Sequence, residues 1–390
     1  MHSTLFFALA CAYASTVLAC TCVVTEYSKI PGALAKCTDI VLQDIAAPSN
    51  GTIDLSKAKK GSVITFAGTT TFAFTNSSDF IPMKFGGKNI TIRGTPDSII
   101  DGNGPMYWDG LGSNGGLPKP NHLIAVKMND SLIENLQLQN WPVRAFKLGN
   151  SRDVTIRNIY LDNTLGDLPN DLSGGKNAAH NSDAFGVGTK SKNILIHNCT
   201  VYNQDDCVAV TSADNVTVSN LYCSGTHGLS IGSIGGKSYN NVTNILFTDS
   251  YLRNSTNGAR IKSNFNTTGY VANITYSNIQ MFNISDYGIV VQQDYLNGGP
   301  TGTPSNGVII ENVLFKNITG TVTSDGISYY VLCGTGCKNF VFEDVKITGG
   351  KPNSSSCNFP ASGCPLASYK TYKSKPLPKY PTCKSPPSAY

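Results

Sequence analysis

One pattern of alternating apolar and polar residues recurs along the chain and indicates its secondary structure. Each copy has a short alternating piece, an Asn or Asp at a corner, and a second alternating piece. The copies are residues 153–163, 193–203, 215–223, 244–252, 273–281, 307–315 and 339–347. Alternation with a period of two is typical of β-strands, and Asn adopts the left-handed backbone of a tight corner at low cost. Because helical periodicity is almost absent, the sequence predicts an all-β fold, a single-stranded parallel β-helix.

Polar residues that are typical of active sites recur at intervals that match one coil of such a solenoid. The interval from Asp183 to Asp205 is the same as the interval from Asp205 to His227. Arg260 and Tyr295 follow at somewhat longer intervals, which one coil could also span. Residues one coil apart lie side by side in a solenoid. We therefore expect these residues to form one cluster on a single face, and the cluster to be an active site.

Two pairs of charged residues constrain the backbone of this cluster. Arg260 and Lys262 are two residues apart, so both side chains leave a strand on the same side. Two cations there suit an acidic ligand group, which Arg can bind with two hydrogen bonds. Asp205 and Asp206 are adjacent, and a regular strand would turn one carboxylate into the core at a high cost in free energy. We expect a bend or bulge that turns both carboxylates outward.

Three carboxylates, those of Asp183, Asp205 and Asp206, would crowd together on this face. Their repulsion would raise at least one pKa and keep a proton available at neutral or mildly acid pH. An acid and a base on one surface can hydrolyse a glycosidic bond. Each Asp alone is as well explained as a corner residue that caps a turn. The whole set, together with Arg260 and Lys262, favours an active site.

The two ends of the chain differ from the repeats. Residues 1–19 are apolar and end in small residues, which indicates a secretory signal peptide. A membrane anchor would need about 20 apolar residues, and a lipoprotein cleavage site before Cys20 is the other alternative. Residues 26–37 alone have helical character, and we expect a short N-terminal capping helix that covers the open edge of the first coil. Residues 20–365 would form the β-helix domain, and residues 366–390 a Pro- and Lys-rich tail.

Cysteine usage fits an exported protein. The chain has 12 Cys, and loss of Cys11 with the signal peptide would leave an odd number. Close pairs suggest local disulfides in an oxidising compartment: Cys207 with Cys223, Cys333 with Cys337, and Cys357 with Cys364. Cys22 and Cys37 could fasten the capping helix. Metal binding is disfavoured because no compact Cys-x-x-Cys pair or His partner accompanies them. Asn-x-Ser/Thr triplets also offer glycosylation sites.

Four motifs stand in order along the chain. They are Asn181-Ser-Asp183, Gln204-Asp-Asp-Cys207, Gly225-x-His-Gly-Leu-Ser-Ile-Gly-Ser233 and Arg260-Ile-Lys262. In this order and spacing they resemble the polygalacturonase family of glycoside hydrolases, over nearly the whole chain after the signal. The segment from Ser285 to Tyr295 resembles the fungal-type endopolygalacturonases in particular. The resemblance implies a right-handed β-helix with a groove on one side, and inverting hydrolysis of the α-1,4 bond between galacturonates in pectin.

The resemblance also implies catalytic roles. Asp205 would be the general acid that protonates the leaving oxygen. Asp183 and Asp206 would hold and activate the attacking water. His227 would tune the protonation of the acid. We expect no metal and no cofactor.

Substrate binding is implied for four further residues. Arg260 and Lys262 would clamp the substrate carboxylate, and a sugar would lie against the ring of Tyr295. Asn181 would support the aspartates or touch the sugar. The implied disulfides are Cys22–Cys37, Cys207–Cys223, Cys333–Cys337 and Cys357–Cys364, which leaves Cys20, Cys199 and Cys383 unexplained. The implied partner of this secreted, monomeric enzyme is homogalacturonan, with neither nucleic acid nor membrane.

Two positions depart from the family pattern. Ser182 replaces the usual Thr, which removes one methyl group. Gly186 stands where a further Asp is common, so activity or cleavage pattern could change. The retained motifs predict an active enzyme and favour endo action, although the loop at residues 162–180 could block the groove. The alternatives are an exo-acting, rhamnogalacturonan- or xylogalacturonan-directed relative, a calcium-dependent pectate lyase, and a non-catalytic pectin-binding β-helix.

Overall fold

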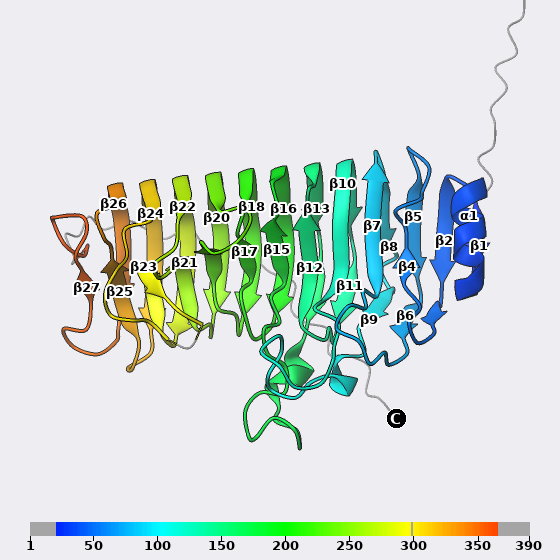
Figure 1. The fold of residues 1–390 in the computed structure, drawn as a ribbon, viewed down its shortest axis with the longest axis horizontal. Helices are drawn as coiled ribbons and strands as arrows, with labels where there is room; N and C mark the ends of the chain where they lie inside the picture. Colours follow the sequence, from blue (N-terminus) through cyan, green and yellow to red (C-terminus); the bar gives the residue numbers. More distant parts are fainter. Residues whose placement is uncertain (1–20, 298, 366–390) are drawn as a thin grey trace, which may run out of the picture.

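The strands of a computed structural model, which describes residues 21–297 and 299–365, wind into a right-handed parallel β-helix (Figure 1). The strand pairings are parallel and join one coil to the next, as in Ile194 beside Val216 and Val216 beside Ile245. The predicted fold class is therefore confirmed. The predicted signal peptide at residues 1–19 and the tail at residues 366–390 lie outside the described residues. None of the described helices has both the length and the apolar character that a membrane crossing requires.

Each full coil contributes strands to three faces. The first face holds mainly long strands: β1 (Cys22–Val24), β2 (Asp39–Gln43), β5 (Val63–Ala67), β8 (Thr91–Gly94), β10 (His122–Glu134), β13 (Arg152–Arg157), β16 (Ser191–Tyr202), β18 (Ala213–Ser224), β20 (Asn241–Arg253), β22 (Gly269–Ile284), β24 (Val308–Val322) and β26 (Cys337–Thr348). The second face holds β3 (Ala46–Ala47), β6 (Thr69–Phe72), β9 (Ile99–Asp101), β11 (Gln137–Gln139) and β14 (Tyr160–Asp162). From β16 onward the long strands turn the corner and supply both faces.

The third face is the one that matters for function. It holds β4 (Ile53–Asp54), β7 (Met83–Lys88), β12 (Arg144–Gly149), β15 (Phe185–Gly188), β17 (Val208–Val210), β19 (Leu229–Ile234), β21 (Asn257–Asn264), β23 (Tyr287–Tyr295), β25 (Ile327–Leu332) and β27 (Ser356–Cys357). The first half of β10 also belongs to it, between β7 and β12. Consecutive members pair in register, so outward side chains of neighbouring coils form ladders along the helix axis.

The corners between faces use asparagine, as the repeat predicts. Asn193, Asn215, Asn244 and Asn273 have φ values of 55°, 57°, 58° and 59°, in the left-handed region that Asn tolerates. Their side chains also bond along the stack: the amide of Asn215 donates to Asn193 at 2.9 Å, and that of Asn273 to Asn244 at 2.9 Å. The recurring corner residue therefore fixes both the turn and its alignment with the next coil.

The interior is apolar and stacked. Phe247, Tyr276, Phe315 and Phe342 occupy equivalent inward positions of successive coils, and their ring centroids are 4.8, 5.3 and 5.0 Å apart. These distances suit offset-stacked rings. The Tyr276 hydroxyl is buried and donates to the carbonyl oxygens of Leu229 at 3.1 Å and Arg260 at 3.0 Å. The core thus supports the strands of the third face from behind.

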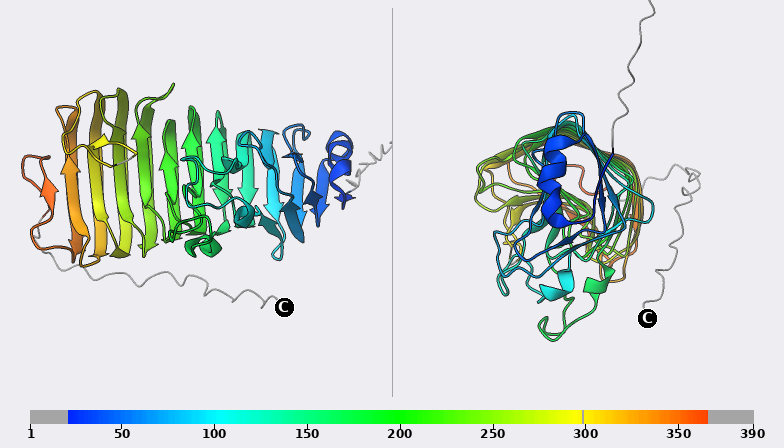
Figure 2. Two further views of the ribbon diagram at one scale, coloured as in Figure 1. Left: turned by 60° about the horizontal axis from the view of Figure 1, so that its bottom comes forward. Right: turned by 90° about the vertical axis from the view of Figure 1, so that its right-hand side faces the viewer.

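A helix covers the N-terminal end of the solenoid, as predicted. The 3-10 turn η1 (Tyr27–Lys29) leads into α1 (Ile30–Lys36), which lies across the first coil in the end-on view (Figure 2). Ile30 and Leu34 lie four residues apart on one helix face, and each is 3% exposed against the core. Two further 3-10 turns, η2 (Gly104–Met106) and η3 (Thr164–Asp167), lie in loops that project from the body (Figure 1).

Four disulfides join cysteines that are close in sequence. They are Cys22–Cys37, Cys207–Cys223, Cys333–Cys337 and Cys357–Cys364, the four pairs that the resemblance implies. The first fastens the end of α1 to β1. Cys199 is a buried free thiol, and burial raises its pKa to about 12. Cys20 and Cys383 lie outside the described residues.

Candidate active site

The predicted catalytic residues precede three neighbouring strands of the third face. Asp183 lies two residues before β15, Asp205 and Asp206 lie just before β17, and His227 lies two residues before β19. Because β15 pairs with β17 and β17 with β19, the three levels are adjacent. One carboxylate oxygen from each of the three aspartates lies within 4.8 Å of the others. The equal spacing along the sequence therefore does correspond to one coil, and it brings these side chains together.

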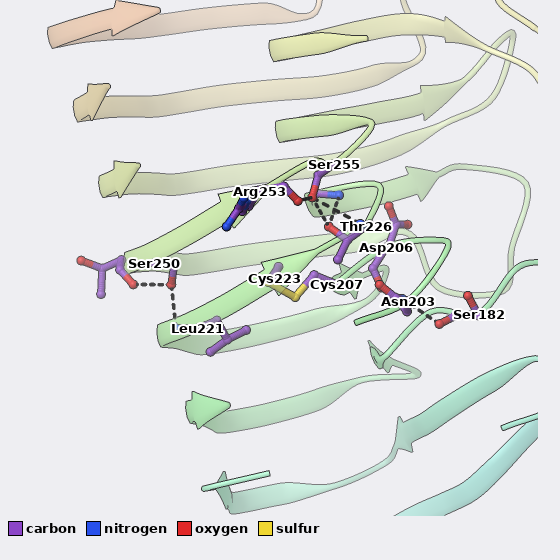
Figure 3. The surroundings of a disulfide bond; sticks show 12 residues. Ser182, Asn203, Asp206, Cys207, Leu221, Cys223, Thr226, Ser250, Arg253 and Ser255 are labelled. Carbon is purple, nitrogen blue, oxygen red and sulfur yellow. Dashed lines mark hydrogen bonds between the residues drawn. A yellow bond between two sulfur atoms is a disulfide. The ribbon is translucent and has the colours of Figure 1, made fainter. Parts of the chain in front are cut away.

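The adjacent aspartates lie in a bend between β16 and β17, as the sequence predicts. The backbone N–H of Asp206 donates to the Asp205 carboxylate at 2.7 Å. Asn203 fastens the bend through its side-chain amide, which donates to the carbonyl oxygens of Ser182 at 2.7 Å and Asp206 at 3.2 Å. Directly after the bend, Cys207 is bonded to Cys223 on β18 (Figure 3). The regular strand is thus interrupted so that neither carboxylate enters the apolar core.

Gln204 ties this bend to the coil before it. Its backbone N–H donates to the Ser182 hydroxyl at 2.8 Å, and that hydroxyl donates to the Gln204 side-chain oxygen at 2.8 Å. Its side-chain amide donates to the carbonyl oxygen of Asn163 and to Asp167, both at 2.8 Å. Ser182 therefore still offers the hydroxyl group that a Thr would have at this position, and this hydroxyl holds Gln204 in the bend.

Asp206 is the most firmly held of the three carboxylates. It is 3% exposed, and its two oxygens accept hydrogen bonds from the Ser230 hydroxyl at 2.6 Å and the Lys262 ammonium at 2.9 Å. The Arg260 guanidinium lies 3.8 Å away. Arg260 and Lys262 both project from β21 toward this carboxylate, as two residues of the same strand face should. Charged partners of this kind compensate for the burial of a carboxylate.

Asp205 lies between a histidine and an asparagine. His227 Nδ1 is 3.4 Å from one of its oxygens, and the Asn181 amide donates to the other at 3.4 Å. Burial would raise the pKa of Asp205, but the charge and hydrogen bond of His227 and the charge of Lys262 lower it below its usual value. Burial would lower the pKa of His227, and the Asp205 carboxylate raises it. In the empty groove these two groups thus favour an ion pair.

Asp183 is the carboxyl that retains a proton. Burial raises its pKa to about 7, and the nearby Asp205 charge adds to the shift. Arg144 on β12 lies 3.6 Å from it and opposes the shift only in part. The cluster therefore carries one proton at mildly acid pH, as the crowding of carboxylates predicts.

The cations of β21 also face an aromatic ring. The Tyr295 ring, at the end of β23, has its centroid 5.5 Å from the Arg260 guanidinium and 5.4 Å from the Lys262 ammonium. Such distances allow cation–π attraction. Asn181 is fixed from the other side, because its side-chain oxygen accepts from the backbone N–H and the hydroxyl of Ser113, each at 3.0 Å. Asn181 thus lies beside Asp205, and Tyr295 lies beside the two cations that approach Asp206.

These groups line a cleft of about 550 Å³ on the third face. Its lining includes all three aspartates, Asn181, Lys262 and Tyr295, while His227 and Arg260 lie outside this lining and contact the aspartates. It also includes residues that the sequence reasoning missed: Arg144, Lys147, Lys237 and Tyr239. Equal spacing along the sequence could not find Arg144 and Lys147, because the coils differ in length. The coil that joins Phe146 on β12 to its partner Phe185 has many more residues than the coil that joins Phe185 to Val208. Gly186 lies on the floor of the cleft.

The three carboxylates are the described group that best suits a divalent cation. Their chemistry in this structure points elsewhere. The Lys262 ammonium donates directly to Asp206, and Arg260 and Arg144 lie near two of the carboxylates. Side chains therefore already supply the positive charge that a bound ion would bring.

Similarity to known proteins agrees with this geometry. The model of the glycosyl hydrolases family 28 matches residues 37–365. The chain belongs to glycosyl hydrolase family 28. Among curated members, the probable endopolygalacturonase D of Emericella nidulans is 55% identical over 88% of this chain and 67% of its own length. The polygalacturonase of Fusarium fujikuroi is 51% identical over 88% of this chain and 93% of its own.

Two solved structures share the architecture. Endopolygalacturonase I from Stereum purpureum, complexed with two galacturonates, is 31% identical, with a TM-score of 0.72 over 85% of this chain and 95% of its own. The endo-xylogalacturonan hydrolase of Aspergillus tubingensis, at 23% identity and a TM-score of 0.69 over 87% of this chain and 100% of its own, supports the fold alone.

Proposed function

We propose that this family 28 member hydrolyses the α-1,4 bonds of polygalacturonic acid inside the chain. The observation that carries the proposal is one groove in which three carboxylates face Arg260 and Lys262. The cations bind the uronate carboxylate of the substrate, since Arg and Lys both donate strongly to carboxylates. Tyr295 beside them offers a ring on which a sugar packs. The relatives named as endopolygalacturonases support the same substrate.

The single proton of the cluster explains how the acid and the base arise together. In the empty groove the proton is on Asp183, while Asp205 is ionised beside His227. A substrate carboxylate that pairs with Lys262 weakens one of the charges that keep Asp205 ionised. The proton then passes to Asp205, which becomes the general acid for the leaving oxygen. Asp183 becomes the base in the same step and accepts a proton from the attacking water.

Asp206 orients this water rather than deprotonating it. Both of its oxygens already accept strong hydrogen bonds, from Ser230 and Lys262. For the same reason Asp206 is a poor nucleophile toward the sugar. The oxygens lie within 4.8 Å of each other, which is closer than the about 6.5–9.5 Å usual for inverting carboxylate pairs. Inversion is therefore proposed from the resemblance of the four motifs to the polygalacturonases and not from the carboxylate spacing.

The shape of the groove supports endo action. The described residues of the loop at 162–180 do not line the cleft, so the loop that could have closed it stands aside. A second cleft lies beside the first on the same face. A polymer can therefore pass through instead of entering by one end. The disulfides support action on homogalacturonan outside the cell, where such bonds persist. We propose that the enzyme acts there as a monomer.

The test is product analysis on polygalacturonic acid. We expect a rapid fall in polymer size with mixed oligomers, and the β-anomer as the first product by NMR, because inversion of an α bond gives β. Asp205→Asn should lower kcat at least about a hundredfold with unchanged circular dichroism, and the exposed Asp325→Asn should change neither. Steady release of monomer would indicate exo action. Unsaturated products lost on adding EDTA would indicate a lyase, and retained turnover in Asp205→Asn would refute the acid.

A further inference from the structure

A second cleft adjoins the catalytic cleft on the third face. It has a volume of about 680 Å³ and is lined mainly by residues of β7, β10 and β12. These strands lie toward the N-terminal end of the β-helix (Figure 1). Lys147 lines both clefts, so the two lie side by side on this face. Coils rise about 4.8 Å each, and Lys147 lies one coil from Gly186 and two from the level of Asp205. The second cleft therefore begins within reach of a polymer bound at the aspartates.

Lysines project over this second cleft without carboxylate partners. Lys147 and Lys127 are exposed on β12 and β10, and neither forms an ion pair with any described residue. At the far end the balance changes: Lys88 pairs with Asp130 at 3.1 Å, and Asp54 lies in register with Lys84. The uncompensated positive charge is thus confined to the two coils next to the catalytic cleft.

The floor beneath these lysines is made of small residues. Lys127 lies in register with Gly86, and Lys147 with Gly186. A Cβ at Gly186 would approach the Phe146 carbonyl oxygen to 3.3 Å and no other atom closely. A carboxylate side chain at this position would lie beside Lys147. The glycine leaves the Lys147 ammonium without such a neighbour on β15.

Other cations add to the positive potential at this end of the catalytic cleft. Burial lowers the pKa of Lys237 to about 8, with further lowering by the charges of Lys147, Lys262 and Arg144. These ammonium groups repel each other in the empty groove, and a bound polyanion would relieve the repulsion.

We propose that Lys147 and Lys127 extend the substrate groove by two coils and bind carboxylates of uronic-acid residues beyond the cleaved bond. A uronic-acid polymer carries one carboxylate per sugar, and a chain lying along the axis presents them to successive coils. The extension makes the enzyme selective for long unesterified runs on this side of the scissile bond. The proposal rests on the proposed function and adds the specificity of its groove.

The test compares Lys147→Gln, Lys127→Gln and the double variant with a matched control. Lys338→Gln removes an exposed lysine on β26, on the first face, whose distance of 3.9 Å to Glu311 marks a weak ion pair. On polygalacturonic acid at low salt we expect KM to rise about two- to fivefold for each groove variant and roughly tenfold for the double, with kcat changed less than twofold. These differences in KM should fade at 0.5 M salt, because the Debye length is then only about 4 Å and the charges are screened.

Four outcomes separate the proposals. Trigalacturonate can reach Lys147, two coils from the level of Asp205, but not Lys127 on the next coil, so Lys127→Gln should leave its KM unchanged and raise KM only on the polymer. On highly methyl-esterified pectin the KM of the groove variants should equal that of the unmodified enzyme, because the lysines meet no free carboxylate. If the double variant and Lys338→Gln have the same KM on the polymer at low salt, Lys147 and Lys127 do not extend the groove, while the proposed polygalacturonase activity is unaffected. Absence of any cleavage by the unmodified enzyme would instead overturn the proposed function.

Discussion

Asp183 decides the protonation state of the groove. Its carboxyl is buried and lies beside Asp205, and both conditions favour its neutral form. A group whose pKa is raised in the folded protein binds its proton more tightly there than in the unfolded chain. Asp183 therefore costs stability once the pH passes its unfolded pKa, and the full cost is reached above about pH 7. The proposed mechanism uses this same proton, which offers a reason for the groove to retain a carboxyl at this cost.

Asp183→Asn should consequently stabilise the protein at high pH and abolish its activity. The neutral amide removes a buried charge, and a shift of about three pKa units corresponds to about 4 kcal/mol as an upper bound. We expect the gain in unfolding free energy over wild type to be on the order of 2 kcal/mol at pH 8 and close to zero near pH 4. Urea unfolding at the two pH values measures it.

A matched variant isolates the effect of burial. Asp325→Asn changes a carboxylate whose side chain is 85% exposed, and its effect should be small and nearly independent of pH. Equal stability changes for Asp183→Asn at pH 4 and pH 8 would show that the pKa of Asp183 is not raised.

Sequence reasoning found the residues whose spacing is regular. Asp183, Asp205 and His227 follow one another at single-coil intervals, and Arg260 and Lys262 share a strand face, so the cluster could be predicted without coordinates. Arg144 and Ser230 could not. Arg144 lies outside the four motifs, and Ser230 lies inside one of them without any sign of its role. Only the register of β12 with β15 and of β17 with β19 brings both residues to the carboxylates.

At the scale of elements, the bend between β16 and β17 carries the chemistry. A regular strand cannot present two adjacent side chains on one side, so the backbone must leave the ladder. Asn203 fastens the bend from beneath, with its amide shared between two carbonyl oxygens. The sequence predicted the bend from the Asp205–Asp206 pair, but it contained no sign of the residue that holds it. Asn203 resembles the corner asparagines of the repeat, and only its contacts distinguish it.

Asn203→Ala should loosen this bend. The carbonyl oxygens of Ser182 and Asp206 would each lose one of two donors and keep the other, from the Trp141 indole and the Ala184 N–H, so the cost in stability should be only about 1 kcal/mol. The Asp206 backbone would also shift, and a displacement on the order of 1 Å at a reacting group can lower kcat about a hundredfold. We expect kcat to fall about ten- to a hundredfold while KM changes much less, because Arg260 and Lys262 stay on β21. Steady-state kinetics on polygalacturonic acid and thermal melting measure both.

The control is an asparagine with an exposed amide. Asn121→Ala removes a single surface hydrogen bond of 3.3 Å to the Ser78 carbonyl oxygen, and it should leave kcat within twofold. A normal kcat in Asn203→Ala despite lower stability would mean that Asn203 serves the fold and does not position Asp206.

At the scale of the whole molecule, the unpaired strand edge at the end of the stack of coils has to be covered. Strand order, corner chemistry and the capping helix follow from the repeat, and so they could be predicted. The helix at residues 30–36 is shorter than the expected segment 26–37, because η1 takes the first residues and Cys37 is extended. The positions of the loops that carry η2 and η3 were not predictable, since their conformation depends on single contacts such as the buried Lys119–Asp109 ion pair at 2.6 Å.

Removal of the apolar contact beneath the capping helix should affect the molecule as a whole and spare the groove. Leu34 is 3% exposed and packs on the first coil, so Leu34→Ala should cost about 2–4 kcal/mol and lower the melting temperature. A displaced helix also uncovers the edge of β1 and β2, which can then pair with a second molecule. Light scattering on heating should therefore begin earlier, while kcat at 25 °C stays within twofold of the wild type. The exposed Lys29→Ala on the adjoining turn η1 should change neither property, and an equal rise in scattering for both variants would show that the helix does not protect this edge.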